Sequence, residues 1–475
     1  MTDKMMRVPS DGAKGFRDLR GPELELRSEL TRKIMKTYAG YGFEALETPA
    51  VEPTEALGGF LPDTDRPNGG AFSFETDEAD LTLRYDLTAP LARFVAGQRD
   101  DLTKPWRRSS AGPVWRNEKS SPGRYREFWQ CDADLVGAPS IGADAEMIAM
   151  ASEALKDASV GDFTIKLSNR KLLDGLLAGL GIQDEELQRN ICRSIDKLDR
   201  LGVDGVADLL GAGRRDASGA FTAGLELTDT QIKSVVDFTT ARDIDALASA
   251  VGSTELGADG LAQIDECLML ARAADAPVLL DPSIVRGLSY YSGTVFEIDL
   301  LGETFDESGA PRRIGSIGGG GRYDSLIRRF TGRDLPCVGF SIGVTRLAQA
   351  LSLRGAETSG PQRPILICVL DVDGMARAQE MARELRAQGM PAQVWYGASR
   401  NIGRQMKYAD KIEASLAVIE GARERDAGEV VIKYLDLGRE ISERAADREA
   451  WLSQEQQVTV NREDLGIEID AFLAK

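Results

Sequence analysis

The chain has 475 residues, 42% of them hydrophobic and 28% charged, which is the balance of a globular protein with two to four domains. It carries 58 basic and 76 acidic residues, a formal net charge of −18, and no histidine. The lack of histidine excludes imidazole metal sites, Ser-His-Asp triads and Cys-His pairs. Catalysis must therefore rest on carboxylates, lysine, arginine, tyrosine, a bound metal ion or positioning.

Neither a membrane segment nor a disulfide framework is expected. The chain has no run of eighteen apolar residues, and its first residues lack the apolar core of a secretion signal. The five cysteines are scattered and include no CxxC pair, so we expect free thiols and no zinc site. These features predict a cytoplasmic protein without a membrane partner or a metal site of its own.

The first third of the chain alternates helical and extended patterns. Apolar residues three and four apart predict a helix over 22–41. Two further runs predict a hairpin with strands at 111–116 and 126–136 and a long polar tip. The other elements expected here are strands at 71–76, 81–85 and 162–168 and helices at 88–97 and 142–157.

The pattern changes near residue 170. Residues 170–275 consist of helical segments with breaks rich in Gly, Asp and Ala, which we interpret as a helical insertion between parts of a sheet. Strand patterns return at 277–281, 291–300 and 312–318, followed by a helix at 341–353. The expected first domain spans residues 1–355.

A polar linker at 355–363 precedes a second expected domain, residues 361–475. Strands and helices alternate there in a βαβ manner. The expected strands are 364–370, 392–396, 415–420 and 428–434, and the expected helices are 373–388 and 400–409. The fold class expected for the whole chain is mixed α/β (α+β).

The hairpin carries the strongest chemical signal. Arg116 and Glu118 alternate on one strand, and Gln130, Asp132 and Asp134 alternate on the other, so each set projects from one face. Buried polar groups need partners, and a face of this composition is not a core face. The hairpin therefore predicts a site for a polar ligand.

Three other segments are less decisive alone. In "TLRYDLTAPLARF" (82–94), Asp86 and Thr88 are suited to a helix N-cap as well as to a ligand. The segment "VRGLSYYSGTVFEI" (285–298) is typical of an edge strand or of a pocket wall. The glycine run of "GSIGGGGRYDSLIRR" (315–329) permits close backbone approach but is weak as a phosphate signal.

Positive charge is concentrated in two short stretches of this acidic chain. Residues 104–126 hold seven basic residues against one acid, and residues 312–333 hold six arginines against one acid. Such islands are suited to phosphate groups, although solvated surface is the ordinary alternative.

Together these segments resemble the histidyl-tRNA synthetases, a family of class II aminoacyl-tRNA synthetases. "YGFEALETPAVEPTE" is similar to class II motif 1, "GPVWRNE…GRYREFWQCDADLVG" to motif 2 and "VGFSIGVTRL" to motif 3. "RGLSYYSGTVFE" and "GGGGRYDSL" resemble the two signatures peculiar to the histidine-specific family. The resemblance implies an antiparallel-sheet catalytic domain with a helical insertion and a C-terminal α/β anticodon-binding domain.

The resemblance also implies a role for individual residues. Arg286 and Arg116 would act at the scissile phosphate, and Arg116, Glu118 and Arg346 would hold ATP. The implied histidine-binding residues are Asp86, Thr88 and Gln130 for the ammonium, Asp134 and Tyr291 for the ring nitrogens, and Tyr290 and Tyr323 as walls. The residues implied at the tRNA acceptor end are Lys119, Ser120, Ser121 and Arg124.

The implied reaction has two steps. The carboxylate of L-histidine attacks the α-phosphate of ATP, and the adenylate then passes its aminoacyl group to the 3′ end of tRNA(His). Arginines and Mg²⁺ would neutralise the phosphates, and no general base is needed because a carboxylate is already a nucleophile. The resemblance further implies a homodimer formed through motif 1.

Alternatives remain at this stage. A non-catalytic regulatory paralogue of histidine biosynthesis shares the catalytic fold, and other class II synthetases share a similar C-terminal domain. The motif 2 loop "EKSSPGR" lacks the "ERPQ" common in bacterial members, so the tRNA bases that are read stay open. The absence of histidine fits either selection for synthesis during histidine starvation or drift.

Overall fold

The computed structural model describes residues 10–57, 70–98, 101–120, 123–216, 219–251, 254–285, 291–302, 304, 315–355, 363–435 and 457–473. The chain divides into two compact units, residues 1–357 and 358–475, each with its own hydrophobic core.

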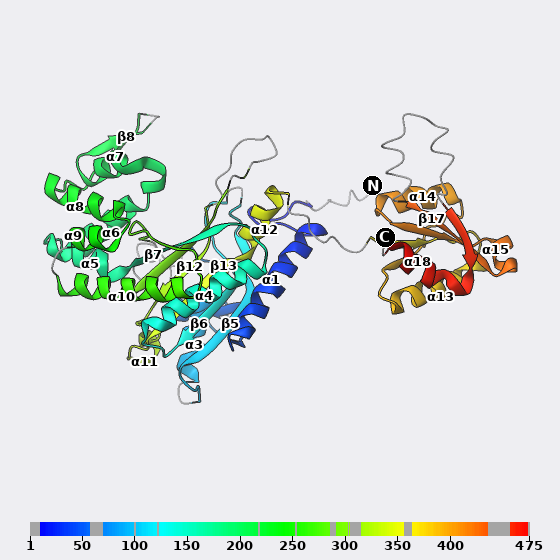
Figure 1. Ribbon diagram of the computed structural model, residues 1–475, viewed down its shortest axis with the longest axis horizontal. Helices are drawn as coiled ribbons and strands as arrows, with labels where there is room; N and C mark the ends of the chain where they lie inside the picture. The colour runs from blue at the N-terminus through cyan, green and yellow to red at the C-terminus, as the bar shows by residue number, and fades with distance from the viewer. Residues whose placement is uncertain are drawn as a thin grey trace. The chain divides into compact units, whose positions relative to one another are not determined.

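The first unit is built on an eight-stranded sheet in the order β1-β5-β6-β13-β12-β11-β7-β10 (Figure 1). The pairs β1/β5 and β7/β10 are parallel and the pairs between them are antiparallel. This sheet confirms the expected fold class. Its strands are β1 Glu44–Ala45, β5 Trp106–Trp115, β6 Glu127–Val136, β7 Phe163–Asn169, β10 Val278–Leu280, β11 Thr294–Leu300, β12 Ser316–Arg322 and β13 Cys337–Gly343.

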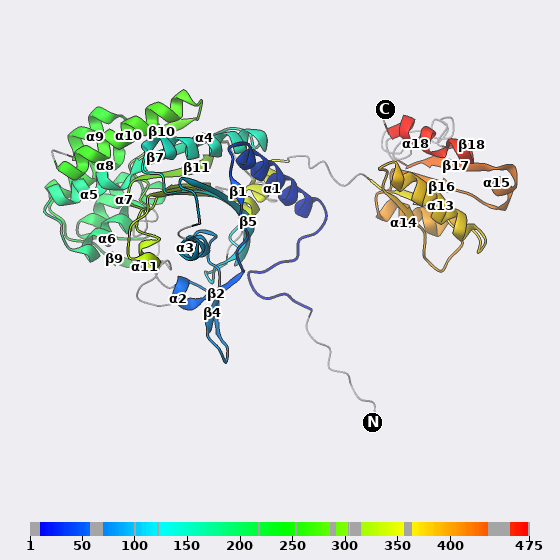
Figure 2. The same ribbon diagram turned by 90° about the horizontal axis from the view of Figure 1, so that it is seen from below.

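The two faces of this sheet differ in chemistry. On β6, Cys131, Ala133 and Leu135 point into the main apolar core, whereas Gln130, Asp132 and Asp134 point the other way. Figure 2 shows the helices α1, α4 and α10 along the apolar side and α3 and α11 on the polar side. The bounds are α1 Pro22–Gly40, α4 Ile141–Asp157, α10 Glu255–Ala273, α3 Thr88–Gly97 and α11 Arg328–Thr331. The polar side is therefore the side on which a ligand can reach the sheet.

A three-stranded sheet, β2-β4-β3, accompanies α2 near the N-terminal part of this unit. Its elements are β2 Val51–Pro53, α2 Thr54–Leu57, β3 Ser73–Glu75 and β4 Asp80–Leu83. The helical insertion lies between β7 and β10 and begins with α5, directly after the last residue of β7. It consists of α5 Arg170–Gly179, α6 Glu185–Ile195, α7 Leu198–Leu210, β8 Gly213–Arg215, β9 Phe221–Ala223, α8 Asp229–Thr240, α9 Ile244–Val251 and α10.

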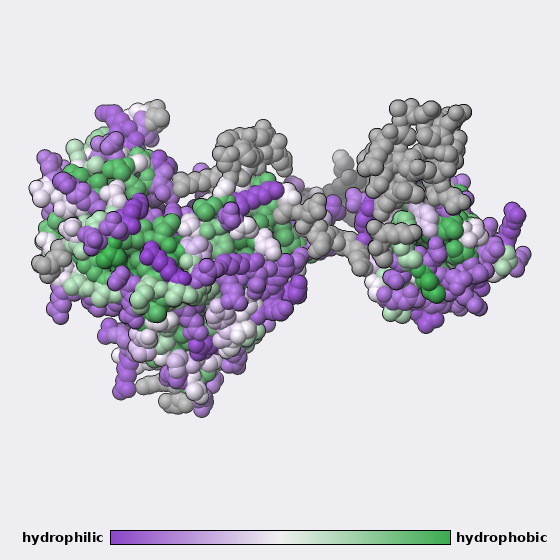
Figure 3. All heavy atoms as spheres, viewed as in Figure 1, coloured by the Kyte–Doolittle hydropathy of each residue, from purple (hydrophilic) through white to green (hydrophobic). Residues whose placement is uncertain are grey.

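The second unit has a five-stranded sheet in the order β15-β14-β16-β17-β18. The pairs β14/β15 and β14/β16 are parallel, as the βαβ pattern predicts, and β17 and β18 add antiparallel edges. Hydrophilic residues dominate its surface on the face drawn in Figure 3. Its elements are β14 Ile365–Ile367, α13 Gly374–Ala387, β15 Ala392–Val394, α14 Ile402–Lys411, β16 Leu416–Ile419, α15 Ala422–Ala427, β17 Glu429–Tyr434, β18 Gln457–Asn461, η1 Arg462–Asp464 and α18 Leu465–Leu473.

Several predicted boundaries were wrong. β5 begins at Trp106, five residues before the expected start, and ends at Trp115, so Arg116 and Glu118 lie just beyond the strand. β12 spans Ser316–Arg322 and ends four residues after the strand expected at 312–318, of which residues 312–314 lie outside the described residues. The glycine run lies inside β12. The helix expected from residue 341 is α12, Val344–Leu353, because β13 continues to Gly343. The elements α15, β18 and α18 were not predicted.

The basic islands are less exposed than the sequence suggested. Arg108 is 0% exposed and pairs with Asp134, and Arg322 is 5% exposed and pairs with Asp144. Arg107 bonds Glu146 at 2.8 Å. These arginines stabilise the sheet and its covering helices, so only part of each island can meet a phosphate backbone.

None of the helices in the described ranges is both long enough and apolar enough to cross a bilayer.

Candidate active site

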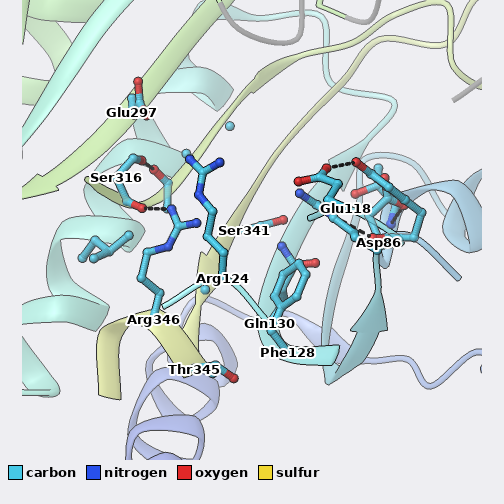
Figure 4. Close-up of a pocket in the computed structure, with 18 of the residues that line it drawn as sticks. Asp86, Glu118, Arg124, Phe128, Gln130, Glu297, Ser316, Ser341, Thr345 and Arg346 are labelled. Atoms are coloured by element: carbon cyan, nitrogen blue, oxygen red, sulfur yellow. Dashed lines mark hydrogen bonds between the residues drawn. The ribbon is translucent and has the colours of Figure 1, made fainter. Parts of the chain in front are cut away.

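A pocket with a volume of about 520 Å³ opens on the polar side of the large sheet. Its lining comes from the turn before α3, the β5–β6 hairpin, the start of β11, the strands β12 and β13, and α12 (Figure 4). The predicted site residues that line it are Asp86, Thr88, Arg116, Glu118, Lys119, Arg124, Gln130, Tyr291 and Arg346. Four segments that are distant in sequence thus meet in one cavity.

The guanidinium of Arg116 lies close to two aromatic rings. Its guanidinium carbon lies 4.4 Å from the ring centre of Tyr85 and 5.0 Å from that of Phe128, and its Nε donates to the Tyr85 carbonyl oxygen at 3.3 Å. The Tyr85 hydroxyl in turn donates to Glu118 at 2.9 Å. Stacking of this kind fixes the plane of the fork while leaving the edge donors of the guanidinium for a ligand.

Arg346 and Arg124 bring two more positive charges to the pocket. Arg346, on the first turn of α12, donates from Nη1 to the Ser316 carbonyl oxygen at 2.6 Å. Figure 4 shows the Arg124 side chain extending beside Arg346 in the direction of Ser316. With Arg116, this part of the pocket is suited to a polyanion such as a chain of phosphates.

Asp86 serves as a helix cap and as a pocket residue at once. Its Oδ1 accepts the backbone N–H groups of Thr88 at 3.1 Å and Ala89 at 2.8 Å, at the start of α3. Its other oxygen, Oδ2, makes no hydrogen bond within the described ranges, and the side chain lines the pocket. The capping and ligand-binding interpretations are therefore compatible, because each uses a different oxygen.

Gln130 also faces the pocket with an open acceptor. The residue is 7% exposed, and its Oε1 has no hydrogen-bond partner within the part of the chain that the structure describes. A buried amide oxygen without a partner costs free energy unless a ligand supplies a donor.

Asp134 lies one layer below the lining. Its Oδ2 accepts from Nη1 of Arg108 at 2.6 Å, and its Oδ1 accepts from the hydroxyl of Tyr323. Arg108 also donates to the Leu87 carbonyl oxygen at 2.8 Å. Asp134 and Tyr323 are 2% exposed and are not part of the cavity lining. The pair fixes the orientation of the Asp134 carboxylate below the cavity.

Tyr291 forms part of the same deep end. Burial raises the pKa of its hydroxyl, and the carboxylates Asp134, Asp86 and Asp132 raise it further. The hydroxyl thus stays protonated at neutral pH and acts as a neutral hydrogen-bonding group. Arg286, Tyr290 and Ser121 lie outside the described residues, and Ser120 is described but does not line the cavity.

Glycines in β12 and β13 leave space for the neighbouring side chains of the site. Gly339 on β13 pairs with Asp134, and a Cβ atom at Gly339 would overlap the Asp134 carboxylate. A Cβ atom at Gly321 would lie 3.0 Å from the ring of Tyr291. The glycine run acts through close approach, since none of its members has a positive φ.

Sequence reasoning missed the residues that support the site. Tyr85, Phe128 and Arg108 were not singled out, although Arg108 is the residue of β5 that lies directly opposite Asp134 of β6. A basic residue inside a strand, opposite an acid of the returning strand, was the available signal.

Known protein families match most of the chain. The family model described as "Histidyl-tRNA synthetase" matches residues 15–347. The chain belongs to the histidyl-tRNA synthetase family. A second family model, "Anticodon binding domain", matches residues 365–463. Both matches confirm the family suggested by the sequence motifs.

Relatives of the family match over nearly the full length. A curated histidine–tRNA ligase of Ruegeria pomeroyi is 47% identical and the match covers 99% of this chain and 98% of the relative. The crystal structure of histidyl-tRNA synthetase from Nostoc sp. PCC 7120 is 28% identical, with a TM-score of 0.74 and coverage of 98% and 100% of the two chains. A Bacillus halodurans structure titled "ATP phosphoribosyltransferase regulatory subunit/histidyl-tRNA synthetase" is 22% identical, with a TM-score of 0.67 and coverage of 85% and 97%, and shows the fold alone.

Proposed function

We propose that this protein is a histidine–tRNA ligase that activates L-histidine with ATP and transfers it to tRNA(His). The observation that carries the proposal is the polarity of the pocket. Arg116, Arg124 and Arg346 supply positive charge for phosphates, whereas Asp86 and Gln130 offer oxygen acceptors for an ammonium. Such a pocket suits an amino acid and ATP bound side by side.

In the first step, the histidine carboxylate attacks the α-phosphate of ATP and pyrophosphate leaves. The carboxylate needs no base, so the protein contributes alignment and charge stabilisation. Arg116, fixed by its two aromatic neighbours, would orient the carboxylate and the α-phosphate, with Glu118 bracing the stack through Tyr85. Arg346 would hold the nucleotide from the other side, and Arg286 would act at the scissile phosphate.

Histidine would be read at both of its ends. Asp86 Oδ2, the Thr88 hydroxyl and Gln130 Oε1 would accept the ammonium. Asp134 and Tyr291 would pair with the two ring nitrogens, with Tyr290 and Tyr323 as walls. The bond from Tyr323 to Asp134 suits a role in holding that carboxylate in place. A site that pairs both nitrogens rejects apolar isosteres by roughly 10⁴-fold or more.

Magnesium fits the same pocket as a companion of ATP. The described residues contain no cluster of three or more metal-ligating side chains. Mg²⁺ usually needs only one or two carboxylates, because phosphates and water complete its shell. Glu297, which lines the pocket beside Ser316, and Glu118 are suited to that part. When bound, the ion would neutralise phosphate charge.

The remaining parts of the proposal concern tRNA and assembly. Lys119, Ser120, Ser121 and Arg124 in the hairpin tip would meet the acceptor end, and the second unit would bind the anticodon. Phosphate contacts of this kind weaken strongly with salt. We also propose a cytoplasmic homodimer formed through the motif 1 segment 41–55, which includes the edge strand β1.

The competing proposal is a non-catalytic paralogue that regulates histidine biosynthesis. Against it stand Arg116 and Arg346 in the pocket and the anticodon-binding match at residues 365–463. No observation in the described structure favours it over the ligase.

ATP–pyrophosphate exchange with each amino acid in turn tests the proposal. We expect exchange with histidine and with no other amino acid, followed by charging of tRNA(His). Lack of exchange with histidine would reject the ligase and favour the paralogue.

A second experiment tests the role of Arg286. We expect Arg286→Ala to remove most of the exchange rate while histidine binding weakens only modestly, because the arginine would act on charge that develops at the phosphate. If this variant keeps nearly full activity, Arg286 has no role at the scissile phosphate.

A further inference from the structure

Asp132 lies at the centre of the polar face of β6, between Gln130 and Asp134. Its side chain is 0% exposed, and neither carboxylate oxygen has a partner among the described residues at hydrogen-bond geometry, although the Ser341 side chain lies close enough to lower the pKa of the carboxyl group. Buried polar groups normally have partners, and a buried carboxylate without one is costly. The position is therefore incomplete in the ligand-free protein.

Asp132 is not part of the cavity lining, but it lies between residues of the sheet that line the deep end of the pocket. Alternation along β6 places Asp132 on the same face as Gln130, which lines the cavity. The residue opposite it on β13 is Ser341, which also lines the cavity, and the residue opposite it on β5 is Ser110. The Asp132 carboxylate thus lies directly below the part of the pocket that Gln130 and Ser341 line.

Charge in this part of the protein is unbalanced. Among the described residues, Arg108 and Arg84 are positive charges that interact with Asp132, and Arg84 is already bonded to the carbonyl oxygens of Pro113 at 2.9 Å and Thr48 at 2.7 Å. The carboxylates of Asp86, Asp132 and Asp134 carry the negative charges. When these five described groups are all ionised, three negative charges face two positive ones, and a bound cation would offset the difference.

We propose that Asp132 is a further specificity-determining residue, whose carboxylate receives the α-ammonium of the bound amino acid together with Asp86 and Gln130. The inference rests on the proposed function, which places an amino acid in this pocket. The ammonium is favoured over the imidazole ring because a neutral ring cannot supply the missing charge. The ammonium also supplies Asp132 with charged N–H donors in addition to the neighbouring Ser341 hydroxyl.

The protonation of Asp132 agrees with this role. Burial raises the pKa of its carboxyl group to about 8, with Asp134 and Asp86 raising it and Arg108 and Ser341 lowering it. The other titratable and charged groups around it are Arg84 after β4, Tyr38 on α1, Tyr291 before β11 and Cys131 on β6. Near pH 7 the empty protein therefore carries a neutral Asp132, and binding of an ammonium drives off its proton.

The central test is the isosteric variant Asp132→Asn. In histidine-dependent exchange we expect the KM for histidine to rise roughly 10- to 100-fold, the range for one charge-assisted hydrogen bond, while the KM for ATP stays unchanged. Histidinol, which keeps the ammonium, should lose inhibition to the same degree. Imidazolepropionate, which lacks the ammonium, should inhibit wild type and variant equally. Ser152→Ala is the matched control, because it removes a buried hydroxyl on α4 that has no partner among the described residues, and it should change none of these values.

Stability gives a signature that a purely structural residue lacks. The folded-state pKa of Asp132 lies above its unfolded value, so this residue lowers the free energy of unfolding progressively as pH rises from about 4 to about 8. The ligand-free Asp132→Asn variant should therefore have a higher melting temperature than wild type. The difference between the two melting temperatures should grow between pH 5 and pH 8.

Calorimetry on the wild-type protein decides the matter even if the variant fails to fold. Titration with histidine at pH 7 in two buffers of different ionisation enthalpy should show release of close to one proton per histidine. No proton release, or an unchanged KM for histidine in Asp132→Asn, would overturn the proposal. An equal loss of imidazolepropionate binding would overturn it too, since Asp132 would then read the ring. Failure of wild-type exchange with histidine is a separate result and rejects the proposed function instead.

Discussion

At the scale of single residues, Arg116 depends on its neighbours for its geometry. Tyr85 and Phe128 flank its guanidinium, and Glu118 holds Tyr85 through the phenol oxygen. A flexible ammonium could neutralise the same charge, but it could not present a planar fork of donors beside two aromatic rings. The site therefore selects arginine for shape as much as for charge.

We predict that Arg116→Lys lowers kcat/KM for ATP in the exchange reaction by roughly 100-fold or more, as expected for loss of a preorganised donor. Arg27→Lys is the matched control, because Arg27 stacks on Trp129 at 4.5 Å outside the pocket. Steady-state exchange and a melting curve on both variants check the prediction. Equal losses in the two variants would mean that stacking serves stability alone.

At the scale of elements, β13 shows how one strand serves two faces. Val338, Phe340 and Ile342 pack into the main core, and Gly339, Ser341 and Gly343 face the polar side. The small residues leave room for the carboxylates of β6, which are longer. A deep polar site is thus made by pairing a strand with short side chains against one with acidic side chains.

The absence of a side chain at Gly339 leads to a prediction. Gly339→Ala should destabilise the first unit by about 1–3 kcal/mol, because its Cβ atom overlaps the Asp134 carboxylate. It should also raise the KM for histidine by displacing that carboxylate. Gly97→Ala, where a Cβ atom meets nothing within 4 Å, serves as the control. Denaturant unfolding and exchange kinetics measure both effects, and a variant as stable as wild type would contradict the predicted overlap.

The sequence predicted which residues share a face better than it predicted which residues pair with one another in the folded site. Alternation placed Gln130, Asp132 and Asp134 on one face, and helical spacing located α1 and α3 to within a residue or two. Glycine carries no side-chain pattern, so the start and end of β12 could not be read from the run at 318–321. Arg108 was counted as surface charge because a linear sequence does not reveal which basic residues pair across strands.

At the scale of the whole molecule, each of the two units has a hydrophobic core of its own. Residues Ile365, Val418 and Ile432 belong to a core within the second unit, and the pocket is built by the first unit alone. Cores that do not share residues can fold separately.

A fragment that ends at residue 357 should therefore keep histidine-dependent pyrophosphate exchange and lose most of its tRNA charging. The pocket would be intact, whereas the proposed anticodon contacts would be absent. Parallel assays of exchange and charging on the fragment and the full chain check this. Loss of exchange in a folded fragment would show that the second unit supports the first.

The two roles of Asp86 restrict which residues can replace it. One oxygen of this carboxylate caps α3 while the other is turned to the pocket. Asn, Ser and Thr can cap a helix but carry no charge, and Glu carries the charge on a longer side chain. Asp alone combines a short capping side chain with a negative charge. A substitution at this position that changed substrate preference would therefore also lower the stability of the fold. A substitution at Gln130 could change substrate preference without removing a helix cap.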